Sequence, residues 1–184
     1  MSQWEYIFYR GNYKNLKLKN LKLEKDYRFE IWRPGIYRLT PPKLFFKNLL
    51  GWWLLHYFKI FKSYDYKLFV IYFKNGEVVH YSVILPKYFS TPFMRNGDLQ
   101  IGPVGTDKKH RRKGLALFAI AKIIEFYKDK DINFWYISRK ENEPSKRLIE
   151  KIGFVKYGEG VKVKKFGLNI LGSFVIKNNF YKND

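Results

Sequence analysis

The 184-residue sequence contains no cysteine. This absence excludes disulfide frameworks, thiolate metal sites and a cysteine nucleophile, and it fits a reducing compartment. We therefore expect a cytoplasmic protein and predict no metal site. The first ten residues, MSQWEYIFYR, carry charges and lack a long apolar core, so we also expect no secretory signal.

Long hydrophobic runs are also missing. The apolar stretch LLGWWLLHYF at residues 49–58 has ten uncharged residues, whereas a membrane-spanning helix needs roughly 20. It predicts a helix that packs on the domain and no transmembrane segment. Because lysines flank its two tryptophans, peripheral contact with a membrane surface stays an alternative.

Acidic residues are scarce: 16 Asp and Glu face 36 Lys and Arg, which gives a net charge of +20. Such a field attracts polyanions, including nucleic acid, anionic lipid and phosphorylated small molecules. The 15 Tyr, 17 Phe and 5 Trp residues provide stacking surfaces for bases, yet many follow core-like patterns. Charge alone does not choose among these partners.

The chain has the composition of one globular domain. It is 46% hydrophobic, which suffices for one core. No Pro-, Gly- or Ser-rich linker divides it, and no internal repeat is evident, so we predict a single domain over residues 1–184.

Short alternating patterns in the first 40 residues predict strands at Trp4–Tyr9 and Leu16–Leu23. Thr40 followed by Pro41 and Pro42 suits a helix start, and the helical pattern runs to about Lys62 with Gly51 as its one breaker, so one long helix or two short ones would fit.

A hairpin is the clearest local signal. Tyr66–Phe73 and Glu77–Leu85 are rich in β-branched and aromatic residues, and Asn75-Gly76 lies between them. The segment 86–97 then predicts a loop, and Leu99–Thr106 predicts a further strand.

A basic turn meets an apolar helix at RRKGLA, residues Arg111, Arg112, Lys113, Gly114, Leu115 and Ala116. The helix is apolar nearly all round as far as Phe126, which predicts packing against a sheet. Free N–H groups and the positive dipole end at its start bind phosphate, and Gly114 lets the backbone approach closely. A solvated basic loop before a buried helix is the alternative.

A second patterned segment follows a predicted strand at Ile132–Ile137. Asn142 is a suitable helix cap, Pro144 is tolerated in the first turn, and Gly153 suits the left-handed position after the last turn. A helix is therefore predicted between Asn142 and Gly153.

Together the two segments resemble the GNAT superfamily of acetyl-CoA-dependent N-acetyltransferases. The resemblance rests on Arg-x-x-Gly-x-Ala at Arg111, Gly114 and Ala116, followed by Asn-x-x-small-x7-Gly-Phe, and it covers roughly residues 66–156. The second pattern comprises Asn142, Ser145, Gly153 and Phe154.

The resemblance implies an α/β (α+β) fold with a mixed, mostly antiparallel sheet that splays in the middle and is flanked by helices. Acetyl-CoA is expected in the splay as acyl donor. Val104 to Thr106 would pair with its pantetheine arm, and the N–H groups of Arg111 to Ala116 would hold its pyrophosphate. Asn142 and Ser145 would lie at the cofactor arm, with Phe154 beneath it.

The implied reaction is direct attack of a neutral primary amine on the thioester, without an acyl-enzyme. The family often has a tyrosine four residues before the motif glycine as acid for the departing thiolate, but this chain has Ile149 there. Tyr136 and Tyr157 are the replacements we consider, and a thiolate with a pKa of about 8.5 can also leave unaided.

Three residues are candidates for the base that deprotonates the amine. His80 borders the expected splay and titrates in the right range, but a hydrogen-bonded structural histidine is the alternative. Glu141 follows the strand at the splay and Asp98 ends a loop, and for both a purely structural or solvated charge is the alternative. His110 lies in the pyrophosphate turn, where contact with phosphate is expected.

The acceptor is predicted from charge. A net charge of +20 repels polyamines and attracts a nucleotide-linked amino sugar, as in bacterial surface-glycan synthesis. The alternatives are a protein or peptide amine, or a non-catalytic nucleic-acid or membrane-surface protein with the same fold. Monomer and homodimer both stay open.

Overall fold

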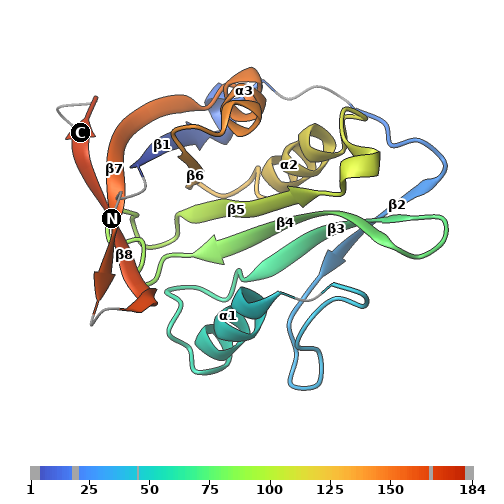
Figure 1. Cartoon of the computed structure of the whole chain (residues 1–184), viewed down its shortest axis with the longest axis horizontal. Coiled ribbons are helices and arrows are strands. Elements are labelled where there is room, and N and C mark those ends of the chain that lie inside the picture. Colours follow the sequence, from blue (N-terminus) through green and yellow to red (C-terminus); the bar gives the residue numbers. More distant parts are fainter. Residues whose placement is uncertain (1–4, 18–20, 45, 166–167, 181–184) are drawn as a thin grey trace.

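A computed structural model describes residues 5–17, 21–44, 46–165 and 168–180. Its described residues form one eight-stranded sheet with three α-helices (Figure 1). The strands are β1 (Glu5–Asn12), β2 (Tyr27–Trp32), β3 (Lys67–Phe73), β4 (Val78–Pro86), β5 (Leu99–Thr106), β6 (Asn133–Arg139), β7 (Val155–Lys165) and β8 (Leu168–Asn179). The helices are α1 (Lys47–Tyr57), α2 (Leu115–Phe126) and α3 (Glu143–Ile152), with 3-10 turns at Tyr13–Asn15 and Lys108–His110.

The sheet is mixed and splays in its middle, which confirms the predicted fold class. Its order is β2-β3-β4-β5-β6-β1-β7-β8, and β5 and β6 are the parallel pair. These two strands pair only at Leu99 with Phe134 and at Gln100 with Trp135. Beyond Gln100 they separate, so the end of β5 has β4 on one side and an open edge on the other.

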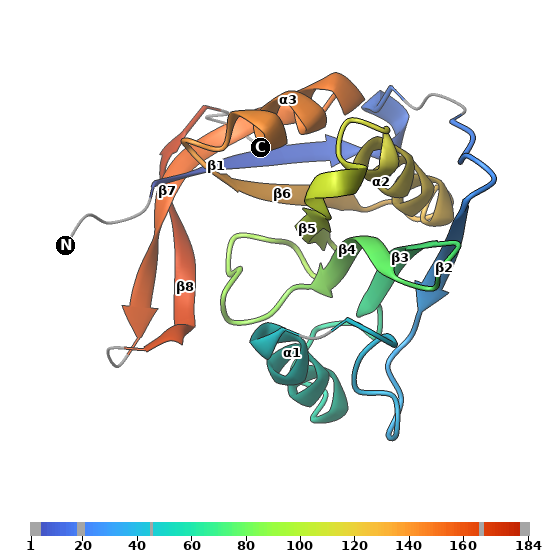
Figure 2. The same ribbon diagram turned by 45° about the vertical axis from the view of Figure 1, so that its right-hand side comes forward.

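Helices cover both faces of the sheet. In Figure 2, α2 and α3 lie on one face and α1 lies on the other. One buried cluster joins α2 and α3 to β5 and β6 through Ile120, Ile149 and Phe134, while Leu49 of α1 packs with Val83 and Leu85 of β4. Because both faces of the central strands are covered, all five inner residues of β3 are buried.

Local signals placed several elements correctly. The β3–β4 hairpin forms, with Gly76 at φ +77° and its N–H donating to the Phe73 carbonyl. The strand Leu99–Thr106 has the predicted bounds. Asn142 caps α3 by accepting a hydrogen bond from the Ser145 N–H, and Gly153 ends the helix at φ +100°.

The strand predicted at Leu16–Leu23 is wrong for its described residues. Leu16, Lys17 and residues 21–23 are irregular, and residues 18–20 lie outside the described part. Leu16 is buried, and the Lys17 N–H donates to the Ile152 carbonyl at 2.7 Å. The start of this pattern, Leu16 and Lys17, therefore belongs to a loop that packs against the end of α3, and it does not form a strand. Of the strand predicted at Trp4–Tyr9, Trp4 lies outside the described residues and the rest belongs to β1.

The first predicted helix has wrong bounds. It begins at Lys47, because Lys43 has a positive φ of 60° that breaks a helix started at Pro41. It ends at Tyr57, and Lys59 follows at φ +55°. The Ile60 N–H then donates to the Leu55 carbonyl, and the Lys59 N–H to that of His56, which is the hydrogen-bond pattern of a Schellman motif. Lys59 therefore occupies the left-handed position after the helix, where glycine is the usual residue.

None of the described helices is both long enough and apolar enough to cross a membrane.

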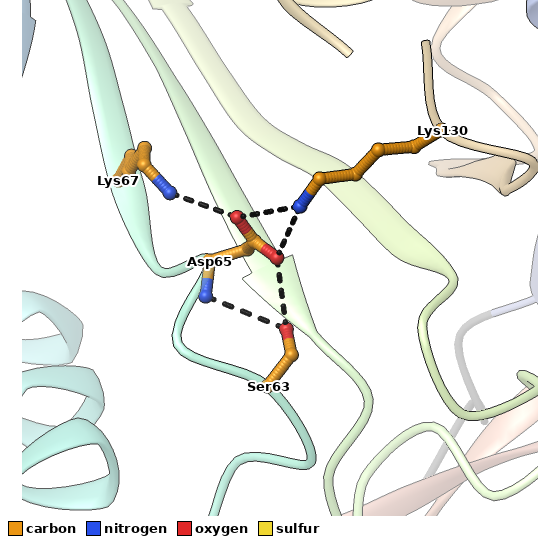
Figure 3. Close-up of polar contacts among 4 residues, drawn as sticks. All are labelled: Ser63, Asp65, Lys67 and Lys130. Atoms are coloured by element: carbon orange, nitrogen blue, oxygen red, sulfur yellow. Dashed lines mark hydrogen bonds and ion pairs between the residues drawn. The ribbon is translucent and has the colours of Figure 1, made fainter.

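A partly buried carboxylate joins two distant loops. Asp65, before β3, accepts hydrogen bonds from Lys67 at 2.9 Å and from Lys130, after α2, at 3.1 Å (Figure 3). Ser63 Oγ donates to the same carboxylate. Burial alone would raise the pKa of Asp65, but the hydrogen bonds and charges of Lys67 and Lys130 outweigh it and hold the pKa below its usual value.

We expect Asp65→Asn to cost about 2 kcal/mol of unfolding free energy at neutral pH. A group with a lowered folded pKa contributes stability above its unfolded pKa, about 3.9, and loses it as the pH falls through the folded value. Urea unfolding should therefore show a constant difference from wild type above about pH 5 that shrinks towards pH 3. Asp26→Asn, in an exposed pair with Lys74, is the control. A pH-independent difference would contradict this account.

Candidate functional site

A cavity of about 1160 Å³ lies in the splay between β5 and β6. Its walls come from Tyr81 of β4, the end of β5, Tyr136 of β6, the loop before α2, the first turn of α2, and α3. Six basic side chains line it, and none of the described lining residues is acidic. The basic residues are Lys108, Lys109, His110, Arg111, Arg112 and Lys151. The cavity is therefore suited to an anion.

The open edge of β5 forms one wall. Val104 and Thr106 line the cavity, and they pair with β4 through Ser82 and His80. Because β6 has already diverged, the other edge of this segment has no strand partner among the residues that the structure describes. An extended ligand can add to this edge as a further strand would.

The first turn of α2 forms part of the cavity wall. Gly114 precedes the helix at φ +75° and, having no side chain, provides no side-chain cap for the first N–H groups. The first intrahelical bond runs from the Phe118 N–H to the Gly114 carbonyl, while Leu115 and Ala116 line the cavity. Arg112, also in the loop, has a positive φ of 63°. N–H groups and the helix dipole here favour negative charge.

Tyr27 of β2 holds the basic loop in place. Its hydroxyl lies 3.0 Å from His110 Nδ1 and accepts a hydrogen bond from Lys113 Nζ at 3.0 Å. The His110 ring also packs on Phe73. On the cavity side, Arg111 Nε donates to the Thr106 carbonyl at 3.2 Å. The loop is thus fixed at both ends, with Lys113 turned away from the cavity.

The opposite wall combines β6 and α3. The Tyr136 hydroxyl lies 2.7 Å from Ser145 Oγ, and both residues line the cavity. Burial raises the pKa of Tyr136, an effect that the Ser145 hydrogen bond partly offsets, so the phenol stays protonated at neutral pH. Lys151, two turns along α3 from Pro144, adds a positive charge to this wall.

Nine of the eleven residues predicted to bind the cofactor line this cavity: Val104, Thr106, Arg111, Arg112, Gly114, Leu115, Ala116, Asn142 and Ser145. The other two do not. Lys113 contacts Tyr27, and Phe154 is buried in the core, where it packs close to Gly11.

The three predicted catalytic residues differ in placement. Tyr136 lines the cavity, whereas His80 and Glu141 do not. His80 is fully buried, its Nδ1 lies 2.7 Å from Thr106 Oγ1, and its Nε2 lies 2.9 Å from Ser82 Oγ. Burial lowers its pKa to about 3. With both nitrogens engaged and the ring neutral, this geometry argues against direct contact between His80 and an amine. Glu141 is exposed in the turn before α3.

Two further candidates have structural partners. Asp98 is 4% exposed, and its carboxylate accepts hydrogen bonds from the N–H of Arg95, the N–H and side chain of Asn133, and Trp135 Nε1. These contacts fasten the closed end of the splay and leave Asp98 no route to a substrate. Tyr157 lies on β7, where its ring packs against Trp135 and Arg10.

Sequence reasoning missed several lining residues. Pro144, Leu148 and Lys151 share one face of α3, and their helical spacing was the signal available. Tyr81 had no such signal. Its ring covers Gly105, where an added Cβ would lie 2.5 Å from it, and it stacks on Phe46 with ring centroids 5.2 Å apart.

The family model described as the acetyltransferase (GNAT) family matches residues 28–154. The chain belongs to this family. Membership supports acetyl transfer in general, with acetyl-CoA as the donor that the fold uses. No curated protein sequence matches the chain.

Solved structures show the same fold at low identity. A Drosophila protein has a TM-score of 0.59 at 15% identity, with 86% of this chain and 49% of that chain covered. A tandem GNAT protein from the clavulanic acid biosynthesis pathway has a TM-score of 0.59 at 10% identity, with 85% of this chain and 51% of that chain covered. A putative GNAT acetyltransferase from Novosphingobium aromaticivorans has a TM-score of 0.51 at 12% identity, with 86% of this chain and 62% of that chain covered. The chain thus spans about half to three-fifths of these proteins.

Proposed function

We propose that residues 1–184 form one cytoplasmic N-acetyltransferase domain that moves an acetyl group from acetyl-CoA to a primary amine. The observation that carries the proposal is the cavity in the splay, where an uncapped helix start adjoins an open strand edge. The first suits a diphosphate and the second suits an extended amide chain, and acetyl-CoA contains both in sequence.

In this proposal the cofactor binds along the cavity in one direction. Its pyrophosphate contacts the N–H groups from Arg111 to Ala116, and its pantetheine amides pair with β5 from Val104 to Thr106. Arg111, Arg112 and Lys151 neutralise phosphate charge from opposite walls. Asn142 and Ser145 lie beside the arm, and Phe154 supports that wall from the core.

The reaction is a direct transfer. The neutral amine attacks the thioester carbon, a C–N bond forms, and the C–S bond breaks as the tetrahedral intermediate collapses. N–H groups on the open edge of β5 stabilise its oxyanion. The amine loses one proton, for which exposed Glu141 acting through water is our candidate, and the thiolate gains one. His80 is assigned a positioning role, because it orients Thr106 at the end of β5.

We expect Tyr136→Phe to lower kcat by about 10- to 100-fold with KM nearly unchanged, because the buried phenol is the proposed acid for the departing thiolate. Thiol release from acetyl-CoA at saturating amine measures the effect. Tyr157→Phe is the control, since Tyr157 does not line the cavity. An unchanged kcat in Tyr136→Phe would show that the thiolate leaves without this acid.

For the acceptor we propose a nucleotide-linked amino sugar of the kind used in bacterial surface-glycan synthesis. The support is the charge of +20 and an all-basic charged lining, which attract a diphosphate and repel polyamines. A panel of UDP-linked amino sugars, spermine and basic peptides, assayed for thiol release, tests this choice. Faster turnover of spermine or a peptide than of every nucleotide sugar would overturn it.

Cofactor binding is tested separately by thermal unfolding with CoA and with a single-stranded RNA. A ligand that binds the folded state raises the midpoint by mass action. We expect CoA at 100 times its Kd to stabilise the fold by about 2.7 kcal/mol. Stabilisation by RNA without any by CoA would contradict the enzymatic assignment.

A further inference from the structure

One segment holds most of the exposed large hydrophobic side chains. Of the sixteen such residues in the described chain, nine lie within residues 36–64. We call this set the α1 face: Ile36, Tyr37, Leu39, Leu50, Leu54, Tyr57, Phe58, Ile60 and Tyr64. Tyr37 is 95% exposed and Tyr64 70%. Soluble monomers rarely gather apolar side chains in this way without a partner.

The same segment carries positive charge only. Between Glu30 and Asp65 the sequence has no acidic residue and six basic ones: Arg33, Arg38, Lys43, Lys47, Lys59 and Lys62. The structure describes the side chains of five of them, Arg33, Arg38, Lys43, Lys59 and Lys62, and all five are exposed. Along the sequence, exposed cations therefore alternate with the apolar residues of the α1 face.

The fold presents this surface as one unit. Trp53 Nε1 of α1 donates to the Gly35 carbonyl at 2.9 Å, which fastens the loop bearing Tyr37 to the helix. The buried Leu49 anchors α1 to the sheet. The Schellman turn after α1 leaves Phe58 and Ile60 exposed beside Lys59. In Figure 2 this region lies on the sheet face opposite α2 and α3.

The mixture of side chains distinguishes among partners. Nucleic acid stacks on aromatic rings but gives no apolar surface to Ile36, Leu50 or Leu54. A symmetric pair of two copies would bring two surfaces of the same positive charge together. An anionic bilayer provides lipid phosphates for the lysines, an interface for the tyrosines, and acyl chains for the aliphatic residues.

We propose that the α1 face docks on an anionic membrane surface. With 11 residues, α1 is too short to cross a bilayer and lies in the plane of the interface. The helix α3 and the loop that precedes α2 lie on the other face of the sheet (Figure 2). Docking through the α1 face therefore leaves both of them in water. The proposal is independent of the acceptor and of acetyl transfer.

The test is cosedimentation of the full chain with phosphatidylcholine vesicles that contain phosphatidylglycerol, compared with pure phosphatidylcholine vesicles. We expect binding to the anionic vesicles only. The double variants Phe58→Ser with Tyr64→Ser, and Lys59→Glu with Lys62→Glu, should each weaken binding by about tenfold or more. Unchanged melting midpoints establish that both variants fold.

Matched controls carry the same changes elsewhere. Phe180→Ser with Val155→Ser removes comparable exposed hydrophobic groups, and Lys14→Glu with Lys25→Glu reverses two exposed lysines away from α1. We expect the apolar control to bind vesicles like wild type. The charge control should lose less than threefold in vesicle affinity, because it weakens only the long-range attraction of the net positive charge.

Three results would overturn the proposal. They are equal loss in the variants and their controls, equal binding to neutral vesicles, and a dimer in sedimentation velocity that Phe58→Ser with Tyr64→Ser dissociates. CoA binding measured on the same samples keeps a failure of docking separate from a failure of the enzymatic assignment.

Discussion

Gly114→Trp is expected to weaken acetyl-CoA binding by about 100-fold or more and leave the fold intact. An ideal Cβ at Gly114 meets no protein atom within 4 Å, and the residue lines the cavity, so an indole there occupies ligand space. It would displace a phosphate from the first turn of α2. Losing two hydrogen bonds to a charged group, roughly 1.5–3 kcal/mol each, weakens binding by about 100-fold or more. Isothermal titration with CoA measures the affinity.

The control for backbone strain is Gly76→Trp. Gly76 has φ +77°, almost the value of Gly114, and lies at the tip of the β3–β4 hairpin outside the cavity. Any side chain at such a φ costs about 1–2 kcal/mol. Both variants should therefore lose similar stability, while only Gly114→Trp loses CoA affinity. A Gly114→Trp protein that binds CoA with the affinity of wild type would falsify the assignment of the phosphate site.

Asp98→Ala is expected to destabilise the fold by about 4 kcal/mol, since buried donors that lose their acceptor cost roughly 1–3 kcal/mol each. The donors include the Asn133 N–H and Trp135 Nε1, which lie at 3.0 and 2.8 Å from the carboxylate. For a chain of this length the melting midpoint should fall by roughly 10 °C. Differential scanning calorimetry measures the shift.

Asp107→Ala provides the comparison for Asp98→Ala. The Asp107 carboxylate accepts from the Lys109 N–H in an exposed turn, and losing that cap costs about 1 kcal/mol. If both variants melted at the same temperature, Asp98 would not fasten the strands. A loss of CoA affinity in Asp98→Ala, measured below its melting point, would show in addition that the closed end of the splay sets the shape of its open end.

The parts of the fold that were predictable have local signals. The β3–β4 turn depends on Gly76, and α3 depends on Asn142 at one end and Gly153 at the other. The helix α2 and the strand before it follow from composition and spacing within a few residues of Gly114. The cavity residues of α2 and α3 that were predicted correctly are those that the two family motifs include.

What escaped prediction depends on contacts between distant residues. Nothing near Asp98 in the sequence indicates that Asn133 and Trp135 bind it, and nothing near Lys113 indicates Tyr27. The end of α1 was missed because Lys59 takes the left-handed conformation that glycine usually marks. His80 has the residue type of a base, but its burial, which determines its pKa, follows from three-dimensional packing.

The position of β1 has a consequence for how the chain assembles. This first strand is inserted between β6 and β7, so that Tyr6 pairs with Arg139 on one side and with Gly160 on the other. A ribosome must therefore synthesise more than a hundred further residues before either neighbour exists. Until then β1 is unpaired, and Ile7, Phe8 and Tyr9, which are buried in the folded protein, stay exposed. We expect slow folding governed by this late closure, and a nascent chain that relies on chaperones to avoid aggregation.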